Sequence, residues 1–354
     1  MTFMTSFDTT LLDAVKWAFT TRRVNRADVQ SFSTDLGAAS AGDLLLCRIV
    51  EIGQHKKIQL ADRRNSTSYP GDLVVLCLAD RYAPDQFQAR AEIGSDFIHL
   101  AASGGVAGTV EAAHARMDEP TLLKPLALLI NGDGRIMNVG DYALDSRPRN
   151  ETATVIGVFG ASMNSGKTTA ASSLAHGLKS AGYKVAGVKA TGTGAFGDFN
   201  SFEDAGVPVS DFTDVGMATT YRQPMERIEE GFNTLVAAAA EQGAEVIVVE
   251  IADGVFQQET RAVLQGKAIR DRLDGILFAA PDALSALGSV IVLDWHGLSP
   301  FAISGMVSCS PLAATEAEEV TGLPILSRED LWDPAVIAEH VEPLMRNRQM
   351  QEVA

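Results

Sequence analysis

The chain has 354 residues, of which 46% are hydrophobic, and its 29 Lys and Arg against 45 Asp and Glu give a net charge of −16. This length suffices for two domains, each with a core of its own. The acidic balance disfavours binding to nucleic acid, and no apolar run approaches the ~20 residues of a membrane helix, so neither partner is expected. The N-terminus lacks a basic stretch followed by an apolar one, and three scattered cysteines make no disulfide framework. A cytoplasmic location is therefore expected.

Residues 1–150 are expected to form a smaller, β-rich N-terminal domain, whose role the sequence does not indicate. Partly periodic apolar residues predict one helix over 10–22. The triplet Gly-Asp-Leu begins two apolar runs, at 42 and at 71, which hints at two similar strand starts in a small barrel. Residues 125–139 predict a hairpin around Asn-Gly-Asp-Gly. Further β-like runs cover 42–50, 57–60 and 72–78.

Residues 151–354 are predicted to form a second domain of the α/β class. A polar segment with a proline, 146–152, precedes it and is taken as the boundary. Beyond this segment strand and helix patterns alternate, which predicts a mostly parallel, doubly wound sheet with helices on both faces. The predicted strands cover 155–160, 183–189, 246–250, 275–279, 301–307 and 324–326. The predicted helices cover 166–180, 225–241 and 334–346, and residues 190–206 are expected to form a loop.

The most informative stretch is Gly160-x5-Gly166-Lys167-Thr168, which lies between a predicted strand and a predicted helix. Such a unit cradles phosphates, because backbone N–H groups and the helix N-terminus face the anion. The lysine bridges the β and γ oxygens, and the threonine hydroxyl contacts Mg²⁺. The usual spacing has four residues between the glycines, whereas here there are five. The sequence thus predicts a nucleoside triphosphate site made by Gly160, Asn164, Ser165, Gly166, Lys167, Thr168 and Thr169.

Polar residues that directly follow strands are the other candidates, because ligands of open α/β sheets gather at the carboxyl ends of strands. Glu250 ends the most apolar strand and is predicted to face Mg²⁺. Asp253 either shares this metal role or shapes the turn. Lys189 ends another strand and is predicted to stabilise a transferring phosphoryl group or to hold an anionic substrate.

Asp211 and Asp214 follow a further strand-like run. One of them is expected to hold Mg²⁺ through water or to act as a base on a substrate amine or hydroxyl. The alternative for Asp211 is a cap on the following turn. His176 is expected to be a packing or surface residue rather than a catalyst.

The phosphate loop, the strand ending in Lys189 and the strand ending in Glu250 together resemble dethiobiotin synthetase over roughly 155–255. The segment 206–212 also resembles two-domain P-loop NTPases related to that enzyme, in the SIMIBI-like class. The first resemblance implies that Lys167 and Thr168 bind ATP and Mg²⁺, that Lys189 contacts substrate and transferred phosphate, and that Glu250 binds magnesium. Residues 1–150 have no counterpart in the biotin enzyme, residues 251–254 replace its Gly-rich turn, and the loop 192–206, where substrate should lie, is unlike its pattern. The resemblance therefore implies the chemistry and not the substrate.

Two functions follow as hypotheses. The first is an ATP- and Mg²⁺-dependent phosphotransferase or ligase that activates a carboxylate or carbamate oxygen on a small molecule. The second is a nucleotide-gated switch or assembly module that acts on a protein partner. Switch ATPases of the Min and ParA type carry a signature lysine where this chain has Ser162. No Asn-Lys-x-Asp is present, so ATP is expected rather than GTP, and a homodimer is expected by analogy alone.

Overall fold

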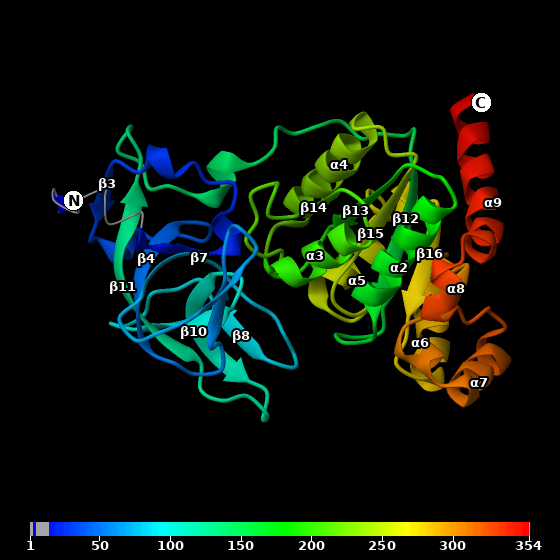
Figure 1. The fold of residues 1–354 in the computed structure, drawn as a ribbon, viewed down its shortest axis with the longest axis horizontal. Helices are drawn as coiled ribbons and strands as arrows, with labels where there is room; N and C mark the ends of the chain where they lie inside the picture. Colours follow the sequence, from blue (N-terminus) through cyan, green and yellow to red (C-terminus); the bar gives the residue numbers. More distant parts are fainter. Residues whose placement is uncertain (1–2, 5–13, 354) are drawn as a thin grey trace. The chain divides into compact units, whose positions relative to one another are not determined.

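The computed structural model describes residues 3–4 and 14–353. The chain divides into two compact units: unit 1 contains Met1–Leu144, Thr193–Phe196 and Phe212–Arg222, and unit 2 contains Asp145–Gly192, Gly197–Asp211 and Gln223–Ala354. Figure 1 labels the elements of both. No described helix is both long and apolar enough to cross a membrane.

Unit 1 is rich in β-structure, as the sequence predicts. Its strands are β1 (Phe3–Met4), β2 (Lys16–Trp17), β3 (Ser31–Ser33), β4 (Leu44–Glu51), β5 (Lys57–Gln59), β6 (Asn65–Thr67), β7 (Leu73–Leu78), β8 (Phe87–Arg90), β9 (Ile98–Ala102), β10 (Val106–Ala113) and β11 (Thr121–Ile130). Short 3₁₀ helices are η1 (Phe19–Thr21), η2 (Arg26–Asp28), η3 (Leu36–Ala38) and η4 (Val139–Tyr142).

The strand pairing of unit 1 closes on itself. β11 pairs with β4, β4 with β7, β7 with β10, β10 with β9, and β9 again with β11. Side chains that alternate along β4 belong to two different buried clusters: Leu44 and Leu46 to one, and Leu45 and Cys47 to the other. Because both faces of these strands are covered, they form unbroken apolar runs rather than alternating ones. The strands that follow the two Gly-Asp-Leu triplets, β4 and β7, are antiparallel neighbours in this ring.

The helix predicted over 10–22 is wrong in its second half, and its first residues lie outside the described part of the chain. Lys16 and Trp17 pair in parallel with Val74 and Val75 of β7, and η1 follows. Residues 17–21 are all buried, so this segment lies within the core of unit 1 and presents no polar helical face to solvent. The hairpin predicted over 125–139 is confirmed, since the Asn131 and Arg135 backbones pair across the turn.

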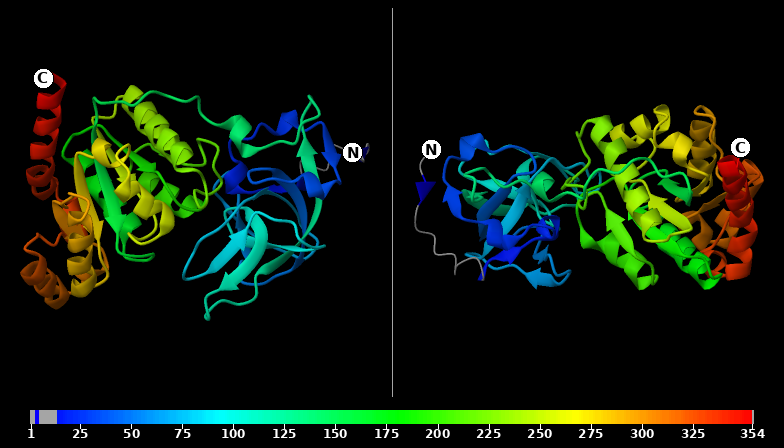
Figure 2. Two further views of the ribbon diagram at one scale, coloured as in Figure 1. Left: turned by 180° about the vertical axis from the view of Figure 1, so that it is seen from behind. Right: turned by 90° about the horizontal axis from the view of Figure 1, so that it is seen from above.

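Unit 2 contains a parallel sheet whose order, among the described strands, is β14-β13-β15-β12-β16-β17. Helices cover both faces: α2 and α9 pack on one and α4 on the other (Figures 1 and 2). This is the predicted doubly wound α/β fold. Its strands are β12 (Thr154–Gly160), β13 (Val185–Lys189), β14 (Val209–Asp211), β15 (Val246–Glu250), β16 (Gly275–Ala279) and β17 (Ala302–Ser304). Its helices are α2 (Lys167–Ser180), α3 (Phe196–Asp204), α4 (Met225–Glu241), α5 (Gln258–Gln265), α6 (Ala283–Asp294), α7 (Pro311–Thr321), α8 (Arg328–Trp332) and α9 (Pro334–Val353), with 3₁₀ helices η5 (Arg270–Arg272) and η6 (Met306–Cys309).

Two predictions for unit 2 are wrong. The expected loop over 190–206 contains α3, which belongs in part to each unit. The strand expected over 324–326 is reduced to one parallel bridge, between Ile303 and Ile325. By contrast, α4 and β16 have the predicted bounds.

Two segments from the second half of the sequence are structural parts of unit 1. Gly194 N–H donates to the Ala218 carbonyl at 2.9 Å, and Phe196 N–H donates to Gln59 Oε1 at 2.8 Å. The Phe196 ring meets Phe19 edge to face, with 6.1 Å between centroids. The segments 193–196 and 212–222 are thus held within unit 1 by backbone pairing and packing.

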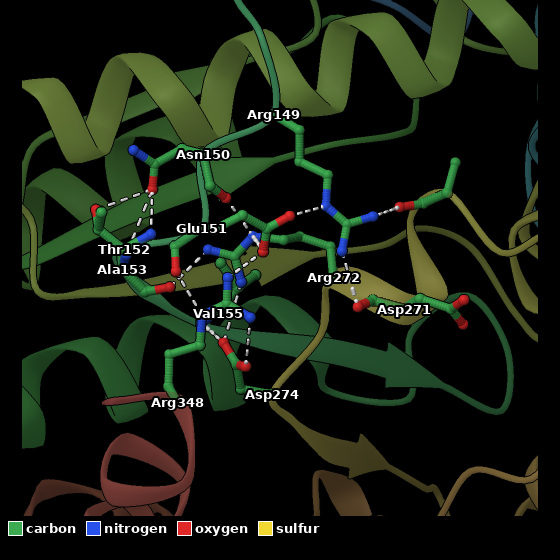
Figure 3. Close-up of polar contacts among 11 residues, drawn as sticks. Arg149, Asn150, Glu151, Thr152, Ala153, Val155, Asp271, Arg272, Asp274 and Arg348 are labelled. Atoms are coloured by element: carbon green, nitrogen blue, oxygen red, sulfur yellow. Dashed lines mark hydrogen bonds and ion pairs between the residues drawn. The ribbon is translucent and has the colours of Figure 1, made fainter. Parts of the chain in front are cut away.

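A buried ionic network anchors the amino-terminal end of β12 (Figure 3). The fully buried Arg272 guanidinium donates to the carbonyls of Asn150 and Ala153, both at 2.6 Å, and to Asp274 Oδ2 at 3.0 Å. Arg348 of α9 lies 3.5 Å from the other oxygen of Asp274. Because these charges are largely removed from water, each depends on its partners.

We expect Arg272→Ala to lower the free energy of unfolding by about 3–5 kcal/mol, because it removes the guanidinium from the largely buried Asp274 carboxylate and leaves two backbone carbonyls without this donor. The measurement is equilibrium unfolding in urea. Arg346→Ala is the matched control: this exposed arginine forms an i,i+4 pair with Glu342, whose loss is expected to cost less than about 1 kcal/mol. Equal effects of the two substitutions would contradict the role given to the network.

Candidate nucleotide-phosphate site

Three of the polar residues singled out by the sequence lie in one row at the carboxyl edge of the unit 2 sheet. Lys189 is in register with Asp211 on one neighbouring strand and with Glu250 on the other. Glu250 is in turn in register with Val158, two residues before β12 ends. Adjacent strands are about 4.8 Å apart, so these three side chains and the loop after β12 start from one short edge.

The loop between β12 and α2 has two residues in the left-handed backbone region. Asn164 and Gly166 both have positive φ, 63° and 98°. A Cβ on Gly160 would lie 2.4 Å from Ser165 Oγ and 2.6 Å from Lys167 Cγ, so no side chain fits there. Ser165 and Lys167 therefore approach the backbone at residue 160, and not at residue 161 where the usual spacing has its glycine. This accounts for the five residues between the two glycines of the loop. We call residues 160–168 the phosphate loop.

Lys167 opens α2 and is almost fully buried. Its ammonium donates to the Ser162 carbonyl at 2.8 Å, across the concave side of the loop. Burial lowers its pKa, while the nearby Glu250 and Asp253 carboxylates oppose that shift. A buried ammonium group at the N-terminus of a helix is a suitable receptor for phosphate oxygens.

Beside the loop, the Thr168 hydroxyl lies within hydrogen-bond distance of two carboxylates. Its oxygen is 2.9 Å from Asp198 Oδ1 and 3.0 Å from Glu250 Oε1. One hydroxyl has one proton, so it donates to one carboxylate at a time. Glu250 is 2% exposed, and its second oxygen has no hydrogen-bond partner in the part of the chain that the structure describes.

This donor set fits Mg²⁺. Magnesium takes hard oxygen ligands and is held by one or two carboxylates, with phosphate oxygens and water completing an octahedron. Thr168, Glu250 and Asp198 supply such oxygens, and a cation here would satisfy the buried Glu250 oxygen. The described residues contain no cluster of three or more His, Cys, Asp or Glu side chains able to hold a metal by themselves.

Asp198 is the site residue that the sequence analysis missed. It lies in the first turn of α3, forms an ion pair with Lys189 and contacts Thr168. The sequence analysis assigned residues 190–206 to a loop and therefore did not consider Asp198 as a site residue. The signal that was available is the recurrence of phenylalanine at 196, 199 and 202, a spacing that favours a helix.

The remaining candidate residues lie at different distances from the phosphate loop, and one of them belongs to unit 1. Asp253 is near enough to influence the pKa of Lys167, and the adjacent Gly254 packs against the backbone of the phosphate loop. Asp211 is buried at the end of β14, next to Lys189. Asp214 belongs to unit 1, where its carboxylate pairs with Arg22 at 2.7 Å, so we leave it out of the site.

Comparison with known proteins gives limited likenesses. No protein-family model and no curated protein matches the sequence. The structure is similar to the signal recognition particle 54 kDa protein of Aeropyrum pernix K1 in complex with GDP, with 21% identity and a TM-score of 0.38, over 60% of this chain and 53% of that chain. It is also similar to the signal recognition particle receptor FtsY of Elizabethkingia anophelis in complex with GDP, with 18% identity and a TM-score of 0.39, over 57% of this chain and 67% of that chain. Nothing about the activity of this chain follows from likenesses of this extent.

We expect Glu250→Gln and Asp198→Asn each to weaken Mg²⁺ binding by about 10- to 100-fold, because each removes a charged oxygen from the Thr168 cluster. The measurement is calorimetric titration of Mg²⁺ into protein mixed with a non-hydrolysable ATP analogue. Glu203→Gln, an exposed change on the same helix as Asp198, is the control and is expected to bind like the unaltered chain. Unchanged affinity in both test variants would remove the metal from this site.

Proposed function

We propose that the chain binds a nucleoside triphosphate with Mg²⁺ at the phosphate loop and hydrolyses it, with ATP as the nucleotide. The observation that supports hydrolysis is the cluster of Thr168, Asp198, Glu250 and Lys189 beside the loop. Backbone N–H groups and the N-terminus of α2 would bind the phosphates, and Lys167 would exchange the Ser162 carbonyl for phosphate oxygens. Thr168, Glu250 and Asp198 would hold Mg²⁺, which when bound neutralises charge on the β and γ oxygens.

Lys189 and Asp198 would respond to the γ-phosphate. Lys189 is 7% exposed and is paired with Asp198. A triphosphate with its metal offers Lys189 an anion and Asp198 a cation, so each gains a new partner as the pair separates. Loss of the γ-phosphate would restore the ion pair.

We further propose that this exchange drives a switch rather than a reaction on a small molecule. The supporting observation is the path of the chain between the two residues: both belong to unit 2, while Thr193–Phe196 between them belongs to unit 1. Asp211 likewise ends a strand of unit 2, and the next residue, Phe212, belongs to unit 1. A change at the γ-phosphate would therefore reach unit 1 through connections of a few residues, as in order–disorder switches of other nucleotide-binding proteins. Unit 1 would then present the signal to a protein partner.

Hydrogen–deuterium exchange tests the switch. We expect residues 193–196 and 212–222 to exchange at different rates with ADP and with a non-hydrolysable ATP analogue, because the Lys189–Asp198 pair differs between the two states. Lys167→Ala, which loses the phosphate contact, should show no such difference. Exchange that is the same with both nucleotides in a protein shown to bind them would reject the switch but not nucleotide binding. Repeating the exchange experiment with GDP and a non-hydrolysable GTP analogue decides whether the site prefers adenine or guanine nucleotides.

Lys189→Ala is expected to lower the rate of ATP hydrolysis about a hundredfold while leaving ATP binding largely intact, because one donor to the transition state is lost. Hydrolysis is measured by phosphate release, and binding by calorimetry. The control is Lys184→Ala, an exposed lysine just before the start of the same strand, which should leave both unchanged. Normal turnover in Lys189→Ala would show that this amine takes no part in the reaction.

A phosphotransferase or ligase acting on a small-molecule carboxylate or carbamate is the second candidate. It is favoured by the position of Lys189 between Asp211 and Glu250 at the sheet edge, where an anionic substrate beside the γ-phosphate would meet an ammonium group. ATP consumption that requires an added metabolite favours this candidate. Consumption without one, accompanied by a nucleotide-dependent change in molar mass, favours the switch and would support the expected homodimer.

A further inference from the structure

A cavity that is open to solvent lies in unit 2, one helical turn beyond the Thr168–Asp198 contact. Its volume is about 430 Å³, its walls come from α2, α3 and α8, and its charged side chains, Asp204 and Arg328, are exposed. Ser172 of α2 lies four residues after Thr168 and donates to its carbonyl at 2.8 Å. Ser201 of α3 lies three residues after Asp198. The cavity volume is in the range of small-molecule sites.

Arg328 brings a positive charge to the α8 wall. Its guanidinium lies 4.3 Å from the centroid of the Trp332 ring, in a cation–π arrangement. Within the described part of the chain no carboxylate lies within ion-pair distance of it. Stacking on a ring holds a guanidinium in place and leaves its N–H groups available for a carboxylate or phosphate.

Asp204 brings a negative charge to the opposite wall, at the C-terminal end of α3. A carboxylate is disfavoured at a helix C-terminus by the helix dipole, so the stability of α3 does not explain it. Among the described residues no cation lies within ion-pair distance of this carboxylate either. The cavity thus has one unpaired charge of each sign on two different elements.

His176 lies between the two on α2. Its Nδ1 is 3.2 Å from the Ala205 carbonyl, and because a carbonyl only accepts, Nδ1 carries the proton. Nε2 of the neutral ring is then an acceptor. Thr169, Ser172 and Ser201 add hydroxyl groups to the lining, and the Trp332 ring adds an apolar edge.

We propose that this cavity binds a small zwitterion of the amino-acid class. The ligand's carboxylate pairs with Arg328 and its ammonium with Asp204. The hydroxyl groups and His176 Nε2 satisfy remaining polar groups, and the ligand side chain lies against Trp332. A plain anion would face the Asp204 carboxylate, and a plain cation would face Arg328, so a ligand with both charges fits best. Thr168 lies on α2 and Asp198 on α3. A ligand that contacts both helices would therefore restrict changes in the distance between the proposed metal-binding oxygens.

The binding measurement needs no nucleotide, so its outcome is independent of the proposed function. Each of the twenty standard L-amino acids is titrated singly into full-length Trp295→Phe protein, in which Trp17 and Trp332 remain. Changes in tryptophan emission are followed together with heat, and they are assigned to Trp332 because the buried Trp17 does not line the cavity. We expect saturable binding of at least one amino acid. Its N-acetyl derivative, which lacks the ammonium, and its amide, which lacks the carboxylate, should each bind at least about tenfold more weakly.

Substitutions in the cavity, compared with a control substitution beside it, test whether the amino acid binds there. Arg328→Gln and Asp204→Asn should each weaken binding of that amino acid at least about tenfold by calorimetry, whereas Glu329→Gln, an exposed change beside Arg328, should not. Circular dichroism and thermal unfolding confirm that the variants fold. The proposal is overturned if no amino acid binds, if neither Arg328→Gln nor Asp204→Asn weakens binding, or if ATP alone saturates the Trp332 signal and displaces the amino acid.

Discussion

The site depends on one hydroxyl proton. Thr168 Oγ1 lies within hydrogen-bond distance of both Asp198 and Glu250 and can donate to one of them at a time. Glu250 is buried, and its other oxygen has no partner within the described chain. Leaving a buried carboxylate short of donors is costly, so the arrangement favours the entry of a cation that several oxygens can share. Mg²⁺ held here would be shared with the phosphate oxygens of a nucleotide bound at the loop beside it.

The backbone of unit 2 makes this arrangement possible. The parallel register places Asp211, Lys189 and Glu250 on three adjacent strand ends, and the phosphate loop follows the fourth strand. At the other end of the sheet, the buried Arg272–Asp274 pair secures the beginning of β12, the strand that leads into the phosphate loop. The charges at that end are paired with one another, whereas at the site end the buried Glu250 carboxylate has one oxygen that a ligand could complete.

The proposed switch depends on short excursions of the chain into unit 1. The connection from Lys189 to Asp198 leaves unit 2 and returns to it, and 193–196 is held in unit 1 by hydrogen bonds and aromatic packing. The cavity between α2, α3 and α8 adds a place where a metabolite would influence the same helices. Nucleotide and metabolite would then act on one pair of elements, which is how two ligands become coupled.

The sequence by itself determined the α/β fold of the second half, the phosphate loop, and the strand-end positions of Lys189 and Glu250. These depend on local patterns: an apolar run, a glycine loop and a helical period, which short-range sterics and hydrogen bonding enforce. Only the tertiary structure decided which charges meet. Asp198 was hidden in an expected loop and contacts Thr168 across 30 residues, while Asp214, three residues after Asp211, belongs to the other unit and pairs with Arg22. Likewise Lys16 and Trp17 form a strand because β7 is there to pair with them. Contacts between distant segments have no local signature, so no pattern within a few residues could reveal them.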